Sequence, residues 1–138
     1  MDKVNIRLNS FVSACATMQR FLHKHYPLTH DMTLDHDDRM GSALILIKHF
    51  ELCYDLSWKC IKDYMYAQYG IEVASPKKAF QECVQRKMLN EQDCELLIGM
   101  VDDRNAATHT YDEKNAIELC NYIAQYHRIM ELLIKVMQ

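Results

Sequence analysis

Apolar residues recur along this chain at alternating steps of three and four, which is the period of an amphipathic α-helix. The first such pattern runs from about Asp2 to His25, and its apolar stripe consists of Val4, Leu8, Phe11, Cys15, Met18 and Leu22. Pro27 and a series of Asp, His and Thr residues interrupt the pattern over Tyr26–Asp37. The sequence therefore predicts a long first helix followed by a polar connector.

A second and longer pattern starts near Asp38 and continues to about Tyr69. One face is marked by apolar and aromatic residues: Ala43, Ile47, Phe50, Tyr54, Ile61 and Tyr64. At 1.5 Å per residue this helix is roughly 45 Å long. Leu46, Cys53 and Cys60 widen its stripe, which indicates burial on more than one side. Gly70 is a suitable C-terminal stop.

Helix-start signals precede three further apolar patterns. Ser75-Pro76 places an N-cap before a proline at the first helical position, and Asn90 can cap a fourth helix. Thr110-Tyr111-Asp112-Glu113 has the form of a capping box and predicts the start of a fifth, long helix. No strand of useful length is evident. We predict an all-α, up-and-down antiparallel helical bundle of three long and two short helices, with residues 1–138 as a single domain.

The composition narrows the possible functions. Only three Gly and two Pro occur in 138 residues, which disfavours a turn-rich β protein. The net charge of −3 indicates no general affinity for nucleic acid, so any RNA contact must come from a local cluster or from an assembled surface. The N-terminus does not resemble a signal peptide, and the longest apolar stretch, Ala43–Ile47, is too short to cross a bilayer. No membrane partner is predicted.

Six cysteines are present, and none form a Cys-x-x-Cys pair. Most fall on apolar helical positions, which favours buried free thiols in a reducing cytoplasm over a zinc site. His30-Asp31 and His36-Asp37-Asp38 contain possible metal ligands, but a solvated turn with an Asp N-cap is the favoured interpretation. We predict neither a metal site nor a cofactor.

The residues most suited to chemistry lie between the fourth and fifth helices, in Arg104-Asn105-Ala106-Ala107-Thr108-His109. Residues five apart diverge by about 140° on a continuous helix, so a helix end between Arg104 and His109 would let the two converge. Arg104 can bind a scissile phosphate, and His109 can move a proton near neutral pH. Asn105 can orient His109 or donate to phosphate. A ribose 2′-hydroxyl would supply the nucleophile.

A purely structural interpretation of this segment is also open. Arg104 can pair with a nearby acid, and Asn105 and His109 can satisfy backbone groups at a helix C-terminus. Spacing alone favours this interpretation, because short Arg/His patterns have many accidental matches.

The same segment resembles the signature of the HEPN domain: an arginine, a polar residue, three more residues, then histidine. Its continuation to Tyr111 resembles the motif of nucleotidyltransferase substrate-binding proteins, a branch that includes HepT-type toxins. Phe50-Glu51-Leu52 through Trp58-Lys59, and Gly70 through Pro76, also resemble this branch, so that the likeness covers nearly the whole chain. The Tyr26–Asp37 connector departs from it, being longer and richer in His and Asp.

The resemblance implies a helical bundle that forms a homodimer, in which two Arg-His motifs face each other. In active members they form a metal-independent endoribonuclease site, with Arg104, His109 and Asn105 here as the catalytic residues. It also implies a cognate minimal nucleotidyltransferase as antitoxin, which in toxin–antitoxin versions adds AMP to the tyrosine of the motif, here Tyr111. A charged nucleotide beside the motif would block the binding of RNA. Transfer RNA is one candidate for that substrate.

Two other functions remain open. A non-catalytic adaptor would bind nucleotide or the nucleotidyltransferase through the same surface, and a purely structural dimer would use Arg104 only for stability. For RNA contact the candidates are Lys59, Lys77 and Lys78, although an exposed lysine on a solvated helix face is the more common case.

Overall fold

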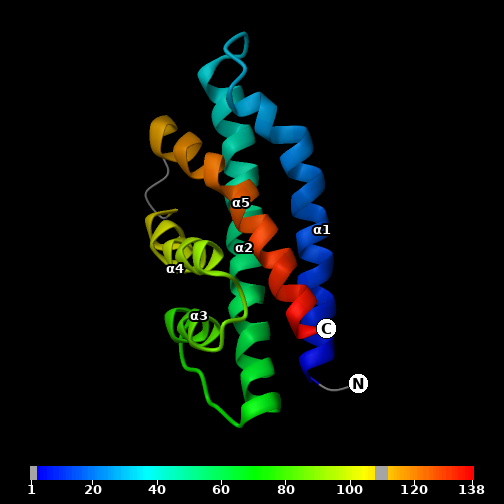
Figure 1. Ribbon diagram of the computed structural model, residues 1–138. Coiled ribbons are helices and arrows are strands. Elements are labelled where there is room, and N and C mark those ends of the chain that lie inside the picture. The colour runs from blue at the N-terminus through cyan, green and yellow to red at the C-terminus, as the bar shows by residue number, and fades with distance from the viewer. Residues whose placement is uncertain (1–2, 108–111) are drawn as a thin grey trace.

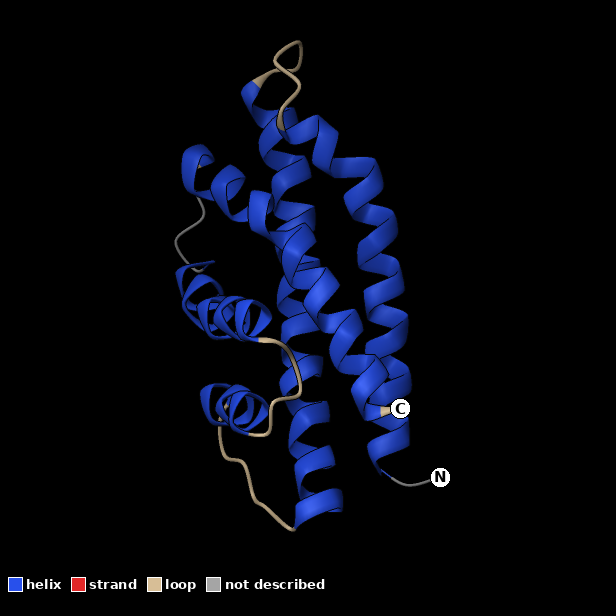
Figure 2. Ribbon diagram, in the orientation of Figure 1, coloured by secondary structure: helices blue, strands red, loops and turns tan. Residues whose placement is uncertain are grey.

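The computed structural model describes residues 3–107 and 112–138, and over these residues the chain is helical (Figure 1, Figure 2). The five helices are α1 (Lys3–Thr29), α2 (His36–Tyr69), α3 (Pro76–Gln85), α4 (Glu91–Ala106) and α5 (Glu113–Met137). No strand occurs within the described ranges. The predicted all-α bundle of three long and two short helices is confirmed.

The three long helices lie side by side, and α1 runs in the opposite direction to α2 and α5 (Figure 1). The short helices α3 and α4 pack together on the side of α2 that faces away from α1 (Figure 1). Of these two helices, α4 also contacts α5. The last turn of α4 is thereby placed between two long helices, and this arrangement positions Arg104.

One continuous hydrophobic core joins all five helices. On α1 it contains Leu8, Phe11, Cys15 and Met18 of the predicted stripe, with Phe11 and Met18 fully buried and Leu22 packed against it. The side chain of Val4 lies outside the described part of the structure. Phe50 of α2 and Phe80 of α3 are also fully buried. The wide apolar stripe of α2 predicted burial on more than one side, and this helix contacts α1, α3 and α5. Its burial on more than one side is confirmed.

Most helix ends follow the predicted cap residues. Ser75 and Asn90 accept hydrogen bonds from the backbone amides of Lys78 and Asp93, at 3.2 and 2.8 Å. Gly70 adopts the left-handed conformation, with φ of 69°. The predicted capping box at the start of α5 is wrong, because Asp112 is the extended N-cap residue and accepts from the amide of Lys114 at 2.8 Å.

The predicted connector is too long at both ends. Helix α1 continues through Pro27 to Thr29, and α2 begins at His36 with Asp35 as its N-cap, so only residues 30–35 connect the two helices. Pro27 has no N–H to donate to the carbonyl four residues earlier, so the helix continues past it with one backbone hydrogen bond fewer. His30 lies outside the helix.

Contacts with α5 hold this end of the hairpin in place. The Tyr26 hydroxyl and His30 Nε2 both lie 2.9 Å from Oδ1 of Asn121. His36 Nδ1 and Arg39 Nη1 lie 2.6 and 2.8 Å from the two carboxylate oxygens of Glu113. The polar residues of the connector region therefore anchor the first half of α5 to the α1–α2 hairpin.

Candidate functional site

Arg104 lies in the last turn of α4, two residues before that helix ends at Ala106. The helix thus ends between Arg104 and His109, which is the condition under which the sequence allows the two side chains to converge. The Arg104 side chain is 24% exposed. Its Nε is buried and has no hydrogen-bond partner among the described residues. The guanidinium therefore combines a largely fixed position with donor capacity that the described residues do not use.

Two side chains of α2 surround this guanidinium. Glu51 Oε2 lies 3.7 Å from Arg104 Nη2, and the Arg104 Cζ lies 5.9 Å from the centre of the Tyr54 ring. A distance of 3.7 Å permits charge attraction but is too long for a good hydrogen bond. The contact with Glu51 agrees with the structural interpretation, in which Arg104 pairs with an acid, and it leaves the fork of donors open to a stronger anion.

Tyr54 itself is buried, and burial raises the pKa of its hydroxyl to about 12. The positive charge of Arg104 opposes this rise, whereas Asp55 and Asp102 add to it. Because the ring stays neutral at all physiological pH values, it provides an uncharged aromatic wall beside the guanidinium. A cation near such a wall is favoured by the ring quadrupole.

The residue before Arg104 is held from the other side. The Asp103 carboxylate accepts a hydrogen bond from the hydroxyl of Tyr126 on α5. Tyr126 is buried, and its pKa is raised well above the ordinary value, first by burial and then by this hydrogen bond. Asp103 faces α5 and Arg104 faces α2, so both long helices hold the last turn of α4.

His109 and Tyr111 lie within 108–111, outside the described residues, so their predicted roles stay predictions. Asn105 is exposed at the end of α4. The residues that sequence reasoning missed are Glu51, Tyr54 and the pair formed by Tyr126 with Asp103. Glu51 belongs to a stretch that carries the family resemblance, and this was the one available signal.

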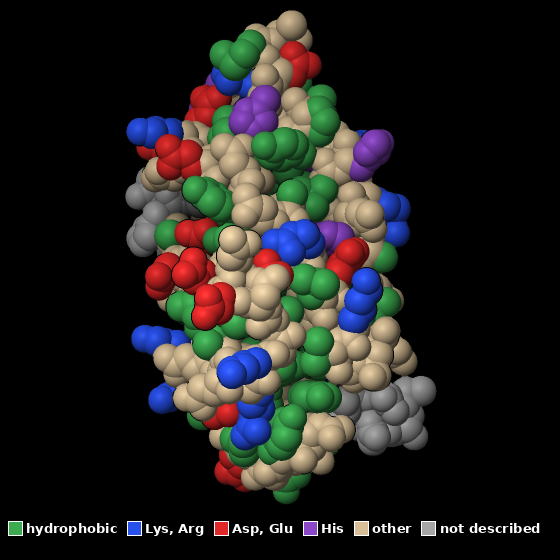
Figure 3. Space-filling view, in the orientation of Figure 1, with side chains coloured by type: hydrophobic (Ala, Val, Ile, Leu, Met, Phe, Trp, Pro, Cys, Tyr) green, Lys and Arg blue, Asp and Glu red, His purple; other side chains and the backbone are tan. Residues whose placement is uncertain are grey.

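The three predicted RNA-contacting lysines lie on α2 and α3. Lys59 lies eight residues beyond Glu51 on α2, which is roughly 12 Å along the helix. Lys77 and Lys78 lie in the first turn of α3. On the face shown in Figure 3, acidic and basic side chains are interspersed rather than separated into a basic tract. Contact of the three lysines with RNA therefore stays a prediction.

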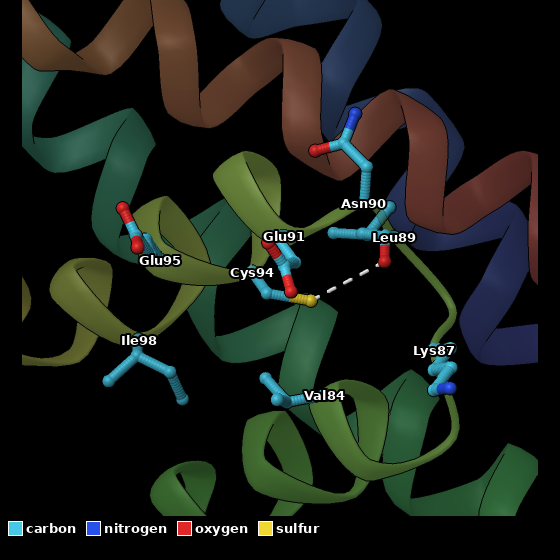
Figure 4. Close-up of a pocket in the computed structure, with 8 residues that line it drawn as sticks. All are labelled: Val84, Lys87, Leu89, Asn90, Glu91, Cys94, Glu95 and Ile98. Atoms are coloured by element: carbon cyan, nitrogen blue, oxygen red, sulfur yellow. Dashed lines mark hydrogen bonds between the residues drawn. The ribbon is translucent and has the colours of Figure 1, made fainter.

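A cleft of about 970 Å³ lies between α3 and α4 (Figure 4). Its apolar lining comes from Val84, Leu89, Cys94 and Ile98, and the thiol of Cys94 donates a hydrogen bond to the Leu89 carbonyl at 3.5 Å. Lys87, Asn90, Glu91 and Glu95 complete the lining. None of the predicted site residues is among them, so this cleft is separate from the chemistry considered for Arg104.

Within the described ranges, no group of three or more His, Cys, Asp or Glu residues is arranged to hold a metal ion. His30, His36 and Asp31 instead bond to Asn121, Glu113 and Thr33. No helix in the same ranges is both long and apolar enough to cross a membrane.

Comparison with solved structures finds the same fold in other proteins. A protein of Thermus thermophilus is 26% identical, with a TM-score of 0.74, and the match covers 93% of this chain and 98% of that chain. A tri-AMPylated HEPN toxin of Shewanella oneidensis, in complex with an MNT antitoxin, is 18% identical with a TM-score of 0.67, over 99% and 97% of the two chains. A toxin–antitoxin structure with AMP-PNP is 17% identical with a TM-score of 0.57, over the whole of both chains.

A search of curated proteins found no match. A family model gives the more specific result, because it matches residues 6–138 and thus includes all five helices and the Arg104–Tyr111 segment. The family is described as "Nucleotidyltransferase substrate binding protein like". This chain belongs to the nucleotidyltransferase substrate-binding protein-like family and has the helical fold of HEPN toxins.

Proposed function

We propose that this protein is a HEPN-type toxin, a metal-independent endoribonuclease that a cognate minimal nucleotidyltransferase neutralises. One observation carries the proposal: the signature arginine, Arg104, faces α2 from the last turn of α4, its side chain is 24% exposed, and its acidic neighbour Glu51 approaches no closer than 3.7 Å. A guanidinium prepared in this way can receive a phosphate without reorganising the bundle.

In the proposed reaction, a ribose 2′-oxygen attacks the adjacent phosphorus while its proton passes to His109. The bond from phosphorus to the 5′-oxygen breaks, and this oxygen takes a proton from a second histidine. The products are a 2′,3′-cyclic phosphate and a 5′-hydroxyl. Arg104 offsets the extra negative charge of the transition state, and Asn105 supports the histidine or the phosphate. In a homodimer, His109 of the second copy supplies the proton.

The outer face of α2 supports the homodimer. Leu44, Ile45 and Leu52 are 45%, 38% and 51% exposed, and they share a helix face with Glu51 because positions 44, 45, 48, 51 and 52 recur at helical spacing. Pairing of this face with its mate would bring the surroundings of two Arg104 residues together. Leu52→Asp should then yield a monomer by light scattering, whereas Val136→Asp, at an exposed apolar position of α5, should not. A Leu52→Asp dimer would refute this interface.

The proposed partner modifies Tyr111. Family membership supports a nucleotidyltransferase partner, and the Shewanella toxin of the same fold is AMPylated in complex with its antitoxin. Incubation with the partner and ATP should add AMP to the wild-type protein and not to Tyr111→Phe, while Tyr111→Phe still cleaves RNA. Mass spectrometry measures the adduct, and an adduct on Tyr111→Phe would show that another residue is the acceptor.

Cleavage itself is tested with purified protein, tRNA and a chelator. We expect cleavage that survives chelation, is lost in His109→Ala and is retained in His23→Ala, which removes an exposed histidine of α1. Intact RNA with the wild-type protein would contradict the nuclease.

The second candidate is a non-catalytic adaptor that binds nucleotide or the nucleotidyltransferase. The 3.7 Å contact between Arg104 and Glu51 favours it, because the arginine already has an acidic neighbour. In that case RNA stays intact, and Arg104→Ala weakens capture of the partner enzyme. If Arg104→Ala lowers the free energy of unfolding but changes neither RNA binding nor partner binding, the role of Arg104 is purely structural.

A further inference from the structure

The outward face of α5 carries a shallow hollow that the proposed catalysis does not use. Its volume is about 470 Å³, and its lining consists of Glu118, Asn121, Tyr122 and Gln125. These positions recur at steps of three and four, so they form one stripe of the helix. Tyr122 is exposed on this stripe. The hollow thus offers one aromatic face surrounded by a carboxylate and two carboxamides.

Tyr122 is the outermost of three stacked rings. Its ring, 48% exposed, stacks on Tyr126 at 6.3 Å with an interplanar angle of 25°, and Tyr126 stacks on Phe50 at 5.5 Å and 24°. Phe50 and Tyr126 are buried. Because buried rings support the exposed one, Tyr122 presents a flat surface whose ordering is largely complete before any ligand binds.

The polar groups beside this ring suit the edge of a nucleobase. Asn121 Oδ1 receives both the Tyr26 hydroxyl and His30 Nε2, which fixes the carboxamide and leaves its nitrogen as the donor. Glu118 is an acceptor only, and Gln125 can both donate and accept. Lys114, exposed and one turn before Glu118, supplies a cation at the end of the stripe for a backbone phosphate.

The hollow is also linked to the neighbourhood of Arg104. Tyr126, which supports Tyr122, donates its hydroxyl hydrogen bond to Asp103, the residue before Arg104. A strand with one phosphate at Arg104 could therefore lay a nearby base on Tyr122. Glu118 would repel a phosphate in the hollow itself, so the base is the part of the strand that fits there.

We infer that Tyr122, with Glu118, Asn121 and Gln125, forms a nucleobase subsite for single-stranded RNA, an inference that rests on the proposed ribonuclease function. The subsite takes a base with an exocyclic amino group, because Glu118 accepts from such a group. Uracil, which lacks one, would place a carbonyl oxygen against the carboxylate. The subsite therefore prefers adenine, cytosine or guanine over uracil at this position of the strand.

Binding of short poly(A) and poly(U) strands by fluorescence anisotropy tests the inference, with every protein in a His109→Ala background so that the strands stay intact. Tyr122→Ala should weaken poly(A) binding about 10-fold, which is typical for loss of an aromatic residue under a stacked base. Tyr122→Phe should bind as its parent does, because the ring remains. Tyr66→Ala, which removes an exposed tyrosine of α2, is the matched control and should have no effect.

Glu118→Gln tests base selection. The substitution adds a donor where only an acceptor stood, so it should raise the affinity for poly(U) and reduce the preference for poly(A). Unchanged poly(A) binding by Tyr122→Ala, or an equal loss in Tyr66→Ala, would overturn the subsite. The subsite would also be refuted if Tyr122→Ala weakened binding of the nucleotidyltransferase partner alone, because this face of α5 would then be a protein-docking surface.

Failure of this inference and failure of the proposed function give different results. If the wild-type protein cleaves RNA and Tyr122→Ala does not alter the KM, the subsite is refuted and the nuclease function is supported. If RNA binding depends on Tyr122 but the wild-type protein does not cleave RNA, the subsite is supported and the nuclease function is refuted.

Discussion

Replacing Tyr126 with Phe removes one hydroxyl from beneath the last turn of α4 and leaves the packing intact. The ring is 3% exposed and stacks on Phe50 at 5.5 Å, and phenylalanine preserves this stacking. The lost group is the donor to the Asp103 carboxylate. The change therefore isolates a single hydrogen bond between α5 and the turn that carries Arg104.

The expected cost follows from the surroundings of the two partners. A hydrogen bond to a charged group contributes about 1.5–3 kcal/mol, and Asp103 is only half-buried, so water can replace part of the loss. We expect Tyr126→Phe to lower the free energy of unfolding by about 1–2 kcal/mol. For 138 residues this corresponds to a fall in Tm of roughly 3–7 °C.

Urea unfolding followed by circular dichroism measures this cost, with an unchanged m-value as the sign that the denatured state is unaffected. Tyr122→Phe is the matched control, because its exposed hydroxyl has no hydrogen-bond partner within the described ranges. A double-mutant cycle with Asp103→Ala should give a coupling energy of about 1 kcal/mol. If Tyr126→Phe costs no more than Tyr122→Phe, or if the coupling is near zero, the hydroxyl does not hold the end of α4.

Three further measurements test other parts of the structure. Glu51→Gln should lower the KM for RNA about 3- to 5-fold with little change in kcat, because a phosphate no longer competes with the Glu51 carboxylate for Arg104. Glu82→Gln, which breaks an ion pair on α3, should leave KM unchanged, and equal effects of the two changes would remove the role of Glu51. Gly70→Ala should lower the free energy of unfolding by about 1–2 kcal/mol, as measured by a thermal melt, because alanine is strained at the φ of 69°. No atom lies within 4 Å of the added Cβ, so steric contact adds nothing, and an unchanged Tm would contradict this account. The free energy of unfolding should fall as the pH rises from 9 towards 12, because of the buried thiols of Cys60, Cys83 and Cys120. Burial raises the pKa of each thiol to about 12 in the folded protein, whereas the same thiols ionise near 9.0 once unfolding exposes them. Equal urea midpoints at pH 8 and pH 10 would refute this assignment.

The helices were predictable wherever the signal was local. Gly70, Ser75 and Asn90 end or begin helices as expected, because the backbone geometry that they favour depends on few neighbours. The end of α1 was predicted too early, because contacts of Tyr26 and His30 with Asn121, more than 90 residues away in sequence, accompany the extra turn. Sequence periodicity contains no information about such contacts.

The start of α5 was wrong for a different reason. Thr110 and Asp112 are both competent N-cap residues two positions apart, and local preference does not choose between them. Glu113 is the first residue of the helix as it stands, and its carboxylate meets His36 and Arg39 of α2. Charge pairing between α2 and α5 thus accompanies the later start, and the pairing depends on how the two helices cross.

The candidate site shows the same division between local and assembled features. Arg104 was predictable from its spacing to His109 and from the family signature, since both are properties of one short segment. Glu51 lies more than 50 residues earlier, and apart from the family resemblance of its stretch, nothing in its surroundings distinguishes it from a solvated acid on α2. Its proximity to Arg104 exists only once α4 is packed beside α2.

The bracing of α4 explains how a chain of net charge −3 can present a usable arginine. Asp103 and Arg104 are adjacent, and an unconstrained turn would let the carboxylate neutralise the guanidinium directly. The hydroxyl of Tyr126 engages Asp103 on the α5 side, and Arg104 is directed to α2, where Glu51 approaches no closer than 3.7 Å. An arriving phosphate brings more negative charge and better fork geometry than this single long contact, so it can compete successfully for Arg104. In the proposed function, the separation of the two charges, rather than an excess of basic residues, lets this site accept an anionic substrate.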